Sequence, residues 1–229
     1  MSEKRWLPGD PLGWAVALLM VGALYMAFVF APTEATMGDV QRIFYFHMPS
    51  AWVTFLAFGV VFVASIQWLR TKQSRWDVMA VSATEVGIVF CTIALMSGSI
   101  WAKPIWGTWW DWDPRLTTTL ILWLIYVSYL MLRTTVENPA RRASLSAVVG
   151  IVGFIDVPLV FMSIRWWRSI HPVLLTADGF EMAPSMVATL MVCLVAFTLL
   201  FVHLLRLRIS LESQREEVER LRDQILYEE

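Results

Sequence analysis

The sequence predicts an all-α polytopic membrane protein: a bundle of six transmembrane helices with both termini in the cytoplasm, followed by a C-terminal cytoplasmic helix. Three observations lead to this prediction. Hydrophobic residues make up 58% of the 229 residues and charged residues only 16%, with a mean hydropathy of +0.60. Six apolar segments have the length needed to cross a bilayer, and Lys and Arg gather in alternate connecting segments. Soluble domains carry roughly 25% charged residues, so composition already excludes an ordinary soluble protein.

The six predicted spans are separated by short polar connections. A helix needs about 20 mostly apolar residues to cross the hydrocarbon core. The fourth segment is the shortest, but it contains no charge from Leu116 to Leu132. The first is longer than the ~7–15-residue apolar region of a signal peptide, so we expect it to remain as an anchor. The spans are expected at 13–31, 51–69, 80–100, 117–132, 143–164 and 183–205.

The distribution of Lys and Arg predicts the orientation, because positive residues gather in the cytoplasmic segments of membrane proteins. With the N-terminus inside, most of the 18 Lys and Arg residues fall on the cytoplasmic side. Three loops, 32–50, 101–116 and 165–182, then lie on the outer face. The positive residues on that face are Arg42, Lys103, Arg115, Arg165 and Arg168.

The middle outer loop is very rich in tryptophan. Tryptophan offers a large, stiff, flat apolar face, so a cluster on a short loop predicts a platform for a flat ligand such as haem. The alternative is the aromatic belt found at membrane interfaces, but belt residues spread over helix ends and explain a single crowded loop poorly. The stretch 101–117, WAKPIWGTWWDWDPRLT, contains Trp101, Trp106, Trp109, Trp110 and Trp112 together with Asp111, Asp113 and Arg115.

Two of the three histidines, His47 and His171, lie in the other two outer loops. Pro49 and Ser50 follow His47 and are good residues for opening a helix. A neutral imidazole is a good axial ligand of haem iron, so we predict that the two histidines approach the iron from opposite faces. The alternative for each histidine is an ordinary polar residue near the membrane interface. His203, near the inner end of the last span, is expected to be structural.

Four cations on the outer face are candidates for pairing with the carboxylates of haem. The planar guanidinium of arginine can bond both oxygens of a carboxylate. For each of them an ordinary interfacial anchor is the alternative. The candidates are Arg115, Arg165, Arg168 and Lys103.

The run 106–117, WGTWWDWDPRLT, resembles the "WWD" signature of haem-handling membrane proteins in cytochrome c biogenesis. The six spans, one outer histidine on each side of the signature and the chain length resemble the cytochrome c maturation protein C (CcmC) family, a haem exporter component. The resemblance covers essentially the whole chain, and the signature shows no departure from the family pattern.

The resemblance implies that the chain binds haem b non-covalently at the periplasmic face of the bacterial inner membrane. It implies His47 and His171 as axial ligands of the haem iron. It also implies delivery of the haem to a periplasmic haem chaperone for c-type cytochrome biogenesis. The implied partners are the ATP-binding and membrane subunits of an ABC transporter and a small membrane protein. We expect ATP hydrolysis to take place on a partner, because this chain has no Walker-type loop. We also expect this chain to carry no catalytic residue.

Two other functions remain open from the residues alone. A membrane b-type cytochrome or quinone oxidoreductase usually holds haem with histidine pairs inside its helices, and the sequence predicts no such pair. A small-solute permease would use the tryptophans as structure. The net charge of −1 gives no support for a nucleic-acid partner. Cys91 and Cys193 fall in predicted spans, outside any C-x-x-C pattern, and are expected to be buried hydrophobic residues.

Two acidic residues fall within predicted spans, where charge is costly and usually faces the bundle interior. Asp156 lies near the middle of the fifth span, two residues before Pro158, and is expected to bond backbone groups freed by a kink. A role in haem passage is the alternative. Glu85 lies nearer the inner end of the third span.

The last part of the chain predicts a separate cytoplasmic segment. Apolar residues at three-to-four spacing from Leu204 to Ile225, with charges on the other faces, predict a helix that continues from the last span. At 1.5 Å per residue it would extend roughly 33 Å beyond the membrane. We therefore divide the chain into a transmembrane haem-handling domain, 1–205, and a helical tail, 206–229, which we expect to contact a partner such as the ATPase subunit.

Overall fold

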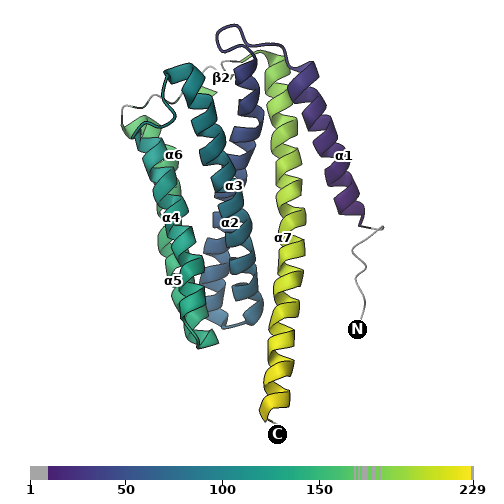
Figure 1. The fold of residues 1–229 in the computed structure, drawn as a ribbon, viewed down its shortest axis with the longest axis vertical. Coiled ribbons are helices and arrows are strands. Elements are labelled where there is room, and N and C mark those ends of the chain that lie inside the picture. Colours follow the sequence, from purple (N-terminus) through teal and green to yellow (C-terminus); the bar gives the residue numbers. More distant parts are fainter. Residues whose placement is uncertain are drawn as a thin grey trace.

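The structure, a computed structural model, describes residues 10–167, 169, 171, 175–176, 179–180 and 182–227. Within these residues, six helical segments are long and apolar enough to cross a membrane, which confirms the predicted all-α multi-pass fold. They stand side by side as an elongated bundle (Figure 1). The segments are Pro11–Phe30, Asp39–Thr71, Ser74–Trp106, Pro114–Thr135, Pro139–Trp166 and Pro184–Arg222.

Several spans consist of two elements. The first joins α1 (Pro11–Tyr25) to a π-helical turn, η1 (Met26–Phe30), and the second joins a 3₁₀ turn, η2 (Asp39–Ile43), to α2 (Phe44–Thr71). The third and fourth are α3 (Ser74–Trp106) and α4 (Pro114–Thr135). The fifth is divided into α5 (Pro139–Phe154) and α6 (Asp156–Trp166), and the last is the long α7 (Pro184–Tyr227). Between α6 and α7, β1 (Leu175–Thr176) pairs antiparallel with β2 (Gly179–Phe180).

Three helices begin with the same pair of residue types, Asp or Asn followed by proline. In each case the side-chain oxygen accepts a backbone N–H of the first turn, and proline occupies a position where a missing N–H costs nothing. The pairs are Asp10–Pro11 at α1, Asp113–Pro114 at α4 and Asn138–Pro139 at α5. The second pair fixes Asp113 at the start of α4, next to the functional site described below.

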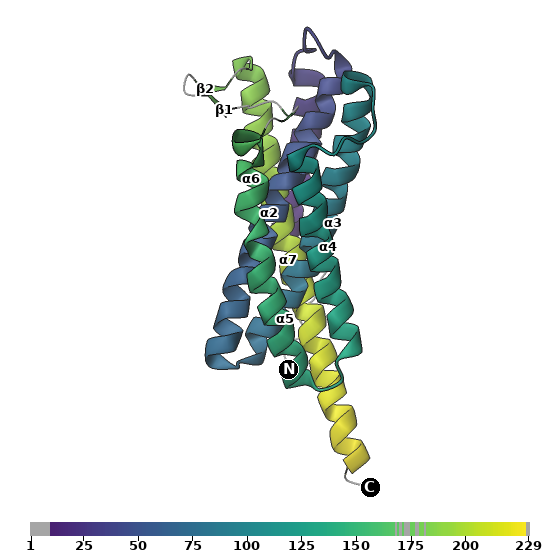
Figure 2. The same cartoon turned by 90° about the vertical axis from the view of Figure 1, so that its left-hand side faces the viewer.

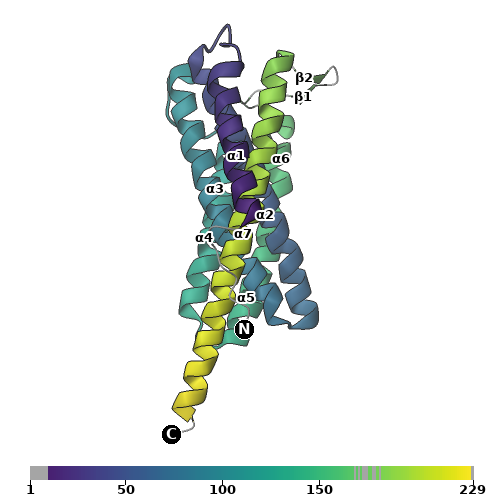
Figure 3. The ribbon, with the colours of Figure 1, turned by 90° about the vertical axis from the view of Figure 1, so that its right-hand side faces the viewer.

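The centre of the bundle is the pair α2 and α3. The helix α2 packs against α3, α5 and α7, and α3 also packs against α4 and α7. The helices α4, α5 and α6 pack against one another, while α1 packs beside α7, as Figures 2 and 3 show from opposite sides. In the core, the ring of Phe58 on α2 stacks on Tyr126 of α4 with centroids 3.6 Å apart. Both side chains are fully buried, so this contact joins the central pair to α4.

The two ends of the bundle differ. One end, called here the loop end, carries η2, the loop between α3 and α4, and the connection from α6 to α7 (Figure 1). The three loops that the sequence places on one face therefore do lie together. The other end, the charged end, carries the short turns from α2 to α3 and from α4 to α5.

Ion pairs join the helices at the charged end. Arg133 of α4 donates to both carboxylate oxygens of Asp77 on α3, at 2.6 and 2.8 Å. Arg208 of α7 pairs with Glu85 of α3 and with Glu212 one turn further along α7. Beyond these contacts α7 continues as one helix to Tyr227, which confirms the predicted helical continuation of the last span. Glu85 is therefore part of an inter-helix ion pair rather than a lone charge.

The second helix begins earlier than the sequence prediction. His47 was expected in a loop, with Pro49 and Ser50 opening the helix, but α2 begins at Phe44 and includes all three residues. This prediction was wrong because η2 leads directly into α2, so Pro49 falls in the second helical turn. Ser50 is fully buried and its hydroxyl donates to the Phe46 carbonyl at 2.7 Å instead of capping a helix start.

The tryptophan-rich loop is shorter than predicted. The helix α3 continues to Trp106, so Trp101, Lys103 and Trp106 are helical, and only residues 107–113 form the loop. Gly107 ends the helix with φ of 77°, a left-handed conformation that glycine adopts without a Cβ clash.

The fifth span is interrupted close to Asp156, as its proline predicts. Pro158 cannot donate to the carbonyl four residues earlier, that of Phe154, and α5 ends at this residue. Asp156 is the first residue of α6. Its Oδ2 is buried without a hydrogen-bond partner among the described residues, so the predicted bond to freed backbone groups is not seen for this oxygen.

Candidate functional site: two histidines at the loop end

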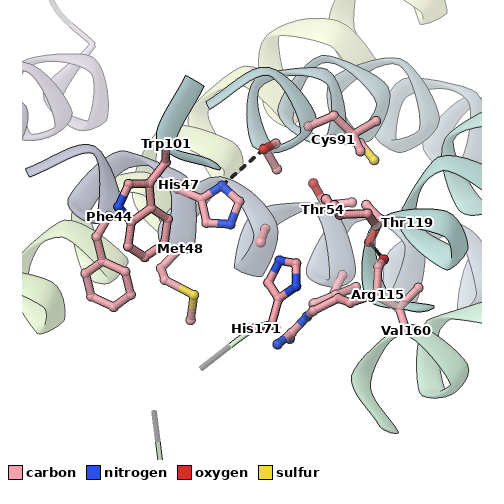
Figure 4. Close-up of a pocket in the computed structure, with 15 residues that line it drawn as sticks. Phe44, His47, Met48, Thr54, Cys91, Trp101, Arg115, Thr119, Val160 and His171 are labelled. Atoms are coloured by element: carbon pink, nitrogen blue, oxygen red, sulfur yellow. Dashed lines mark hydrogen bonds between the residues drawn. The ribbon is translucent and has the colours of Figure 1, made fainter. Parts of the chain in front are cut away.

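A cavity with about 70 Å³ of space lies inside the bundle near the loop end. Its walls come from α2, α3, α4, α6 and the connection after α6. Figure 4 shows the imidazole rings of His47 and His171 pointing toward each other across this space, with the side chain of Arg115 beside His171. Most of the other lining is apolar and includes Phe44, Met48, Phe55, Leu95, Trp101, Leu116 and Val160. The structure thus brings together the two histidines that the sequence singled out.

His47 is held from α3. Its Nδ1 lies 3.1 Å from the carbonyl oxygen of Ala94 and 3.1 Å from Oγ of Ser97. A carbonyl oxygen can only accept, so Nδ1 carries the hydrogen and Nε2 is the unprotonated nitrogen of the neutral ring. Gly98 lets the ring approach this closely, because a Cβ there would lie 3.1 Å from Cε1 of His47.

His171 is held from the start of α4. Its Nδ1 lies 3.2 Å from Oδ1 of Asp113, and its backbone N–H donates to Oγ of Ser169 at 3.1 Å. Burial lowers the pKa of His171 below its ordinary value, while Asp113 partly opposes this by raising the pKa. The neutral ring therefore donates from Nδ1 to the carboxylate and, like His47, keeps Nε2 unprotonated.

Asp113 is a buried carboxylate with two tasks. Besides contacting His171, its Oδ1 accepts the backbone N–H of Arg115 at 2.9 Å and so caps α4. Only 6% of the residue is exposed. The sequence placed Asp113 among the ligand-contacting residues, whereas the structure places it behind His171. Asp111, two residues earlier, is exposed to solvent.

The tryptophans fall into two groups. Trp101 and Trp106 lie next to the histidines: the ring centroid of Trp101 is 6.0 Å from that of His47, and Trp106 is 5.5 Å from His171. Trp110 and Trp112 contact each other edge to face at 5.8 Å. Trp112 is 73% exposed and Trp109 is 58% exposed. All three loop tryptophans therefore lie outside the cavity lining, and Trp109 and Trp112 lie on the surface of the loop end.

The cations are also divided by the structure. Arg115 lines the cavity, whereas Arg165 is exposed at the end of α6. Lys103 donates to the carbonyl of Gly107 at 2.9 Å and lies over the ring of Trp109. Arg168 lies outside the described residues. Among the four predicted cations, Arg115 is thus the one that the described structure places at the histidines.

His203 lies apart from this site. Its Nδ1 is 3.3 Å from Oδ2 of Asp10, the residue that caps α1, so it joins α7 to the start of α1. This contact agrees with the structural role expected from the sequence.

Sequence reasoning missed Phe44 and Val160, which line the cavity from α2 and α6 and belong to no motif, so only the packing of the helices reveals them. It included Trp101 in the tryptophan-rich stretch but did not place it beside His47. For Trp101 a signal existed: it lies four residues after Ser97, on the face of α3 that holds His47.

Comparison with known proteins gives the family. The sequence profile of the family described as Heme exporter protein C matches residues 4–224. The chain is 36% identical over 213 residues to the Heme exporter protein C of Bradyrhizobium diazoefficiens, covering 92% of this chain and 79% of that protein. It is 35% identical to the proteins of the same name from Rhodobacter capsulatus, over 93% of this chain and 90% of that protein, and Paracoccus denitrificans, over 92% and 89%. With the match extending over nearly the whole six-helix bundle, the chain belongs to the Heme exporter protein C family.

Proposed function

We propose that this chain binds haem between His47 and His171 and delivers it for c-type cytochrome biogenesis. The observation that carries the proposal is that two imidazoles from distant segments line one cavity, each with Nδ1 already bonded to an acceptor. Such a bond fixes the tautomer and leaves Nε2 as the metal-binding nitrogen, an arrangement usual for ligating histidines. Two axial imidazoles match haem iron, whose other ligands come from the macrocycle.

The surroundings of the histidines suit haem in charge and polarity. The apolar lining accepts the macrocycle, and the Arg115 guanidinium suits a propionate carboxylate. With about 70 Å³, the cavity is smaller than the roughly 300–1,000 Å³ of ordinary ligand sites. Binding therefore separates the two rings and leaves part of the haem outside the cavity, against the tryptophans of the loop end.

In this proposal the residues of the loop end have distinct roles. His47 and His171 ligate the iron, Arg115 pairs with a propionate, and Asp113 positions His171. The remaining residues predicted from the signature, together with the outer cations, surround the exposed part of the haem. These are Trp106, Trp109, Trp110, Asp111, Trp112, Arg165 and Arg168.

The loop end faces the periplasm of a bacterial inner membrane in this proposal, and a periplasmic haem chaperone receives the haem there. The chain is a non-catalytic subunit of an ABC-type haem exporter, together with ATP-binding and membrane subunits and a small membrane protein. The family membership favours this function over a quinone oxidoreductase or a small-solute permease.

The exposed tail of α7 is the proposed contact for the ATP-binding subunit. Glu216 accepts a hydrogen bond from Oγ of Ser74 at 2.7 Å, which joins α7 to the start of α3. Beyond Glu216 the charged helix continues to Tyr227. Removing residues 217–229 keeps that contact and the Arg208 ion pairs, and we expect it to weaken co-purification with the ATP-binding subunit. Unchanged recovery of the subunit would refute this contact.

The handover step can be tested with the full chain in vesicles. Haem-loaded protein is mixed with the chaperone, and transfer is followed by absorbance. Replacing Trp109 and Trp112 together by alanine is expected to slow transfer while haem stays bound, because both side chains are exposed and outside the cavity. Trp14→Ala, a change at an exposed tryptophan of α1, is the control. Equal transfer rates in all three proteins would contradict the proposed role of the loop.

A further inference from the structure

A second, open groove lies on the surface between α3 and α4, in the half of the bundle nearer the loop end. It has a volume of about 480 Å³ and almost entirely apolar walls. The helix α3 contributes Leu95, Met96, Ser99 and Ile100, the loop contributes Trp110, and α4 contributes Leu120. All of the α3 and α4 residues lie in membrane-spanning segments, so the groove opens toward lipid.

The groove adjoins the histidine cavity, and the side chain of Leu95 lines both spaces. On α3 the neighbouring Ala94 holds His47, and on α4 Thr119 lines the cavity while Leu120 lines the groove. Leu95 therefore stands between the two spaces, where α3 meets α4.

The groove is framed at both ends. Toward the middle of the bundle, the indole N–H of Trp123 on α4 donates to Oγ1 of Thr92 on α3 at 2.9 Å. Toward the loop end, the 107–113 loop connects the same two helices. Between these two ties, the groove is lined by Leu95, Met96, Ser99 and Ile100 of α3 and by Leu120 of α4.

One polar group at the groove lacks a partner in the described part of the chain. The indole Nε1 of Trp110 is buried without a hydrogen bond among the described residues. A buried donor without a partner is unfavourable, so an acceptor that reaches it stabilises the protein. Trp110 lines the groove from the loop side, and Arg115 lines the adjoining cavity.

We infer that this groove is a lateral portal through which haem passes from the outer half of the bilayer to His47 and His171. The inference rests on the proposed function, because it supplies the route to that same site. The flat apolar macrocycle slides between α3 and α4 past Leu95, while a propionate accepts from the Trp110 indole before it reaches Arg115. A lipid acyl chain fits the apolar walls, but it has no acceptor for the Trp110 indole and no group that would bind to Arg115 or to the histidines.

The test compares two sources of haem for the full chain, purified without haem and reconstituted in phosphatidylcholine vesicles. Haem is either dissolved in the bilayer beforehand or offered in water, bound to albumin. Formation of the bis-histidine absorbance is followed in time. Leu120→Trp, which fills the groove without touching the cavity, is the main variant, and Leu95→Trp is the second. Val89→Trp, at a lipid-facing position of α3 outside the groove, is the control.

We expect Leu120→Trp to slow loading from the bilayer at least about tenfold, equivalent to a barrier higher by about 1.4 kcal/mol, with unchanged final occupancy. Loading from water and loading of Val89→Trp should match the wild type. Equal bilayer loading rates for Leu120→Trp and wild type would overturn the portal and mark the groove as a lipid site. Wild-type protein that acquires no bis-histidine absorbance from either source would overturn the proposed function itself.

Discussion

Asp113 Oδ1 lies 3.2 Å from Nδ1 of His171 and accepts the backbone N–H of Arg115 at 2.9 Å. A single buried carboxylate thus starts α4 and orients one of the two facing imidazoles. Because Arg115 follows two residues later and lines the same cavity, the start of α4 sets both the His171 ring and the cation in place. The proposed haem site is therefore built on a helix cap.

Asp113→Asn separates these two tasks. Asparagine caps helices about as well as aspartate, so α4 should still begin in place, but the charge that makes His171 a stronger ligand is removed. Haem affinity in a titration of the purified protein is expected to fall about 10- to 100-fold, the usual cost of losing such a partner. Asp111→Asn, at an exposed position, should lower affinity much less. Equal affinities for both variants would rule out a positioning role for Asp113.

Acid should release the haem, and the direction follows from His171. Burial lowers the pKa of His171 below its ordinary value of 6.5, with Asp113 opposing by raising it. The imidazole must be neutral to bind iron, so occupancy should hold at neutral pH and decline only at a pH lower than the ordinary value of 6.5. The same sign applies to folding: stability linked to this group is complete above the unfolded pKa and is lost as pH falls toward the folded one.

Haem release on acidification is followed by the loss of the Soret absorbance. The contact with Asp113 is tested in the haem-free protein, because Asp113→Asn also weakens haem binding. There, removing the charge removes an influence that raises the pKa of His171, so the imidazole should titrate at lower pH by NMR. The Asp111→Asn protein serves again as the reference. A His171 titration that moved to higher pH in Asp113→Asn would contradict the structure around His171.

Gly98 gives a steric test of His47. A Cβ at this position would lie 3.1 Å from Cε1 of His47, so Gly98→Val should displace the ring from Ala94. Overpacking of this kind costs typically about 1–3 kcal/mol, which corresponds to roughly 5- to 150-fold in haem affinity. Gly22→Val introduces the same side chain on α1 where nothing lies within 4 Å, and it should bind haem normally. The idea fails if the two valine variants retain haem equally well.

Arg115 and Arg165 make a matched pair for the propionate contact. Arg115 lines the cavity and Arg165 is exposed at the end of α6. A hydrogen bond to a charged group contributes about 1.5–3 kcal/mol, so Arg115→Gln should weaken haem binding roughly 10- to 100-fold, measured as the rate of haem loss to apomyoglobin. Arg165→Gln should change that rate much less. A larger effect at Arg165 would move the propionate contact to the outside of the bundle.

Hydropathy predicted the six spans because lipid requires each crossing segment to be a long apolar helix. It could not predict where the helices end. The second span extends back through His47 because η2 joins α2, and the third extends to Trp106 before Gly107 stops it. Apolar length fixes the middle of a span, whereas caps and turns fix its ends.

The candidate site was predictable by residue type but not by contact. The sequence identified His47, His171 and Arg115 because they lie in the predicted outer loops together with the tryptophan-rich stretch. The structure places all three at one cavity. The bonds that orient the rings, to Ala94 and to Asp113, join residues far apart in sequence. They depend on how α2, α3 and α4 pack, which no local pattern reveals.

The most direct test of the account is the absorbance spectrum of the purified protein with its haem. Wild-type protein and His203→Ala should both give a low-spin spectrum with two nitrogen axial ligands. Replacing His47 and His171 together by alanine should abolish that spectrum while the protein still inserts into the membrane, and added imidazole should restore part of it. A low-spin spectrum that survives the double replacement would show that the iron is held elsewhere, and the haem site described here would be wrong.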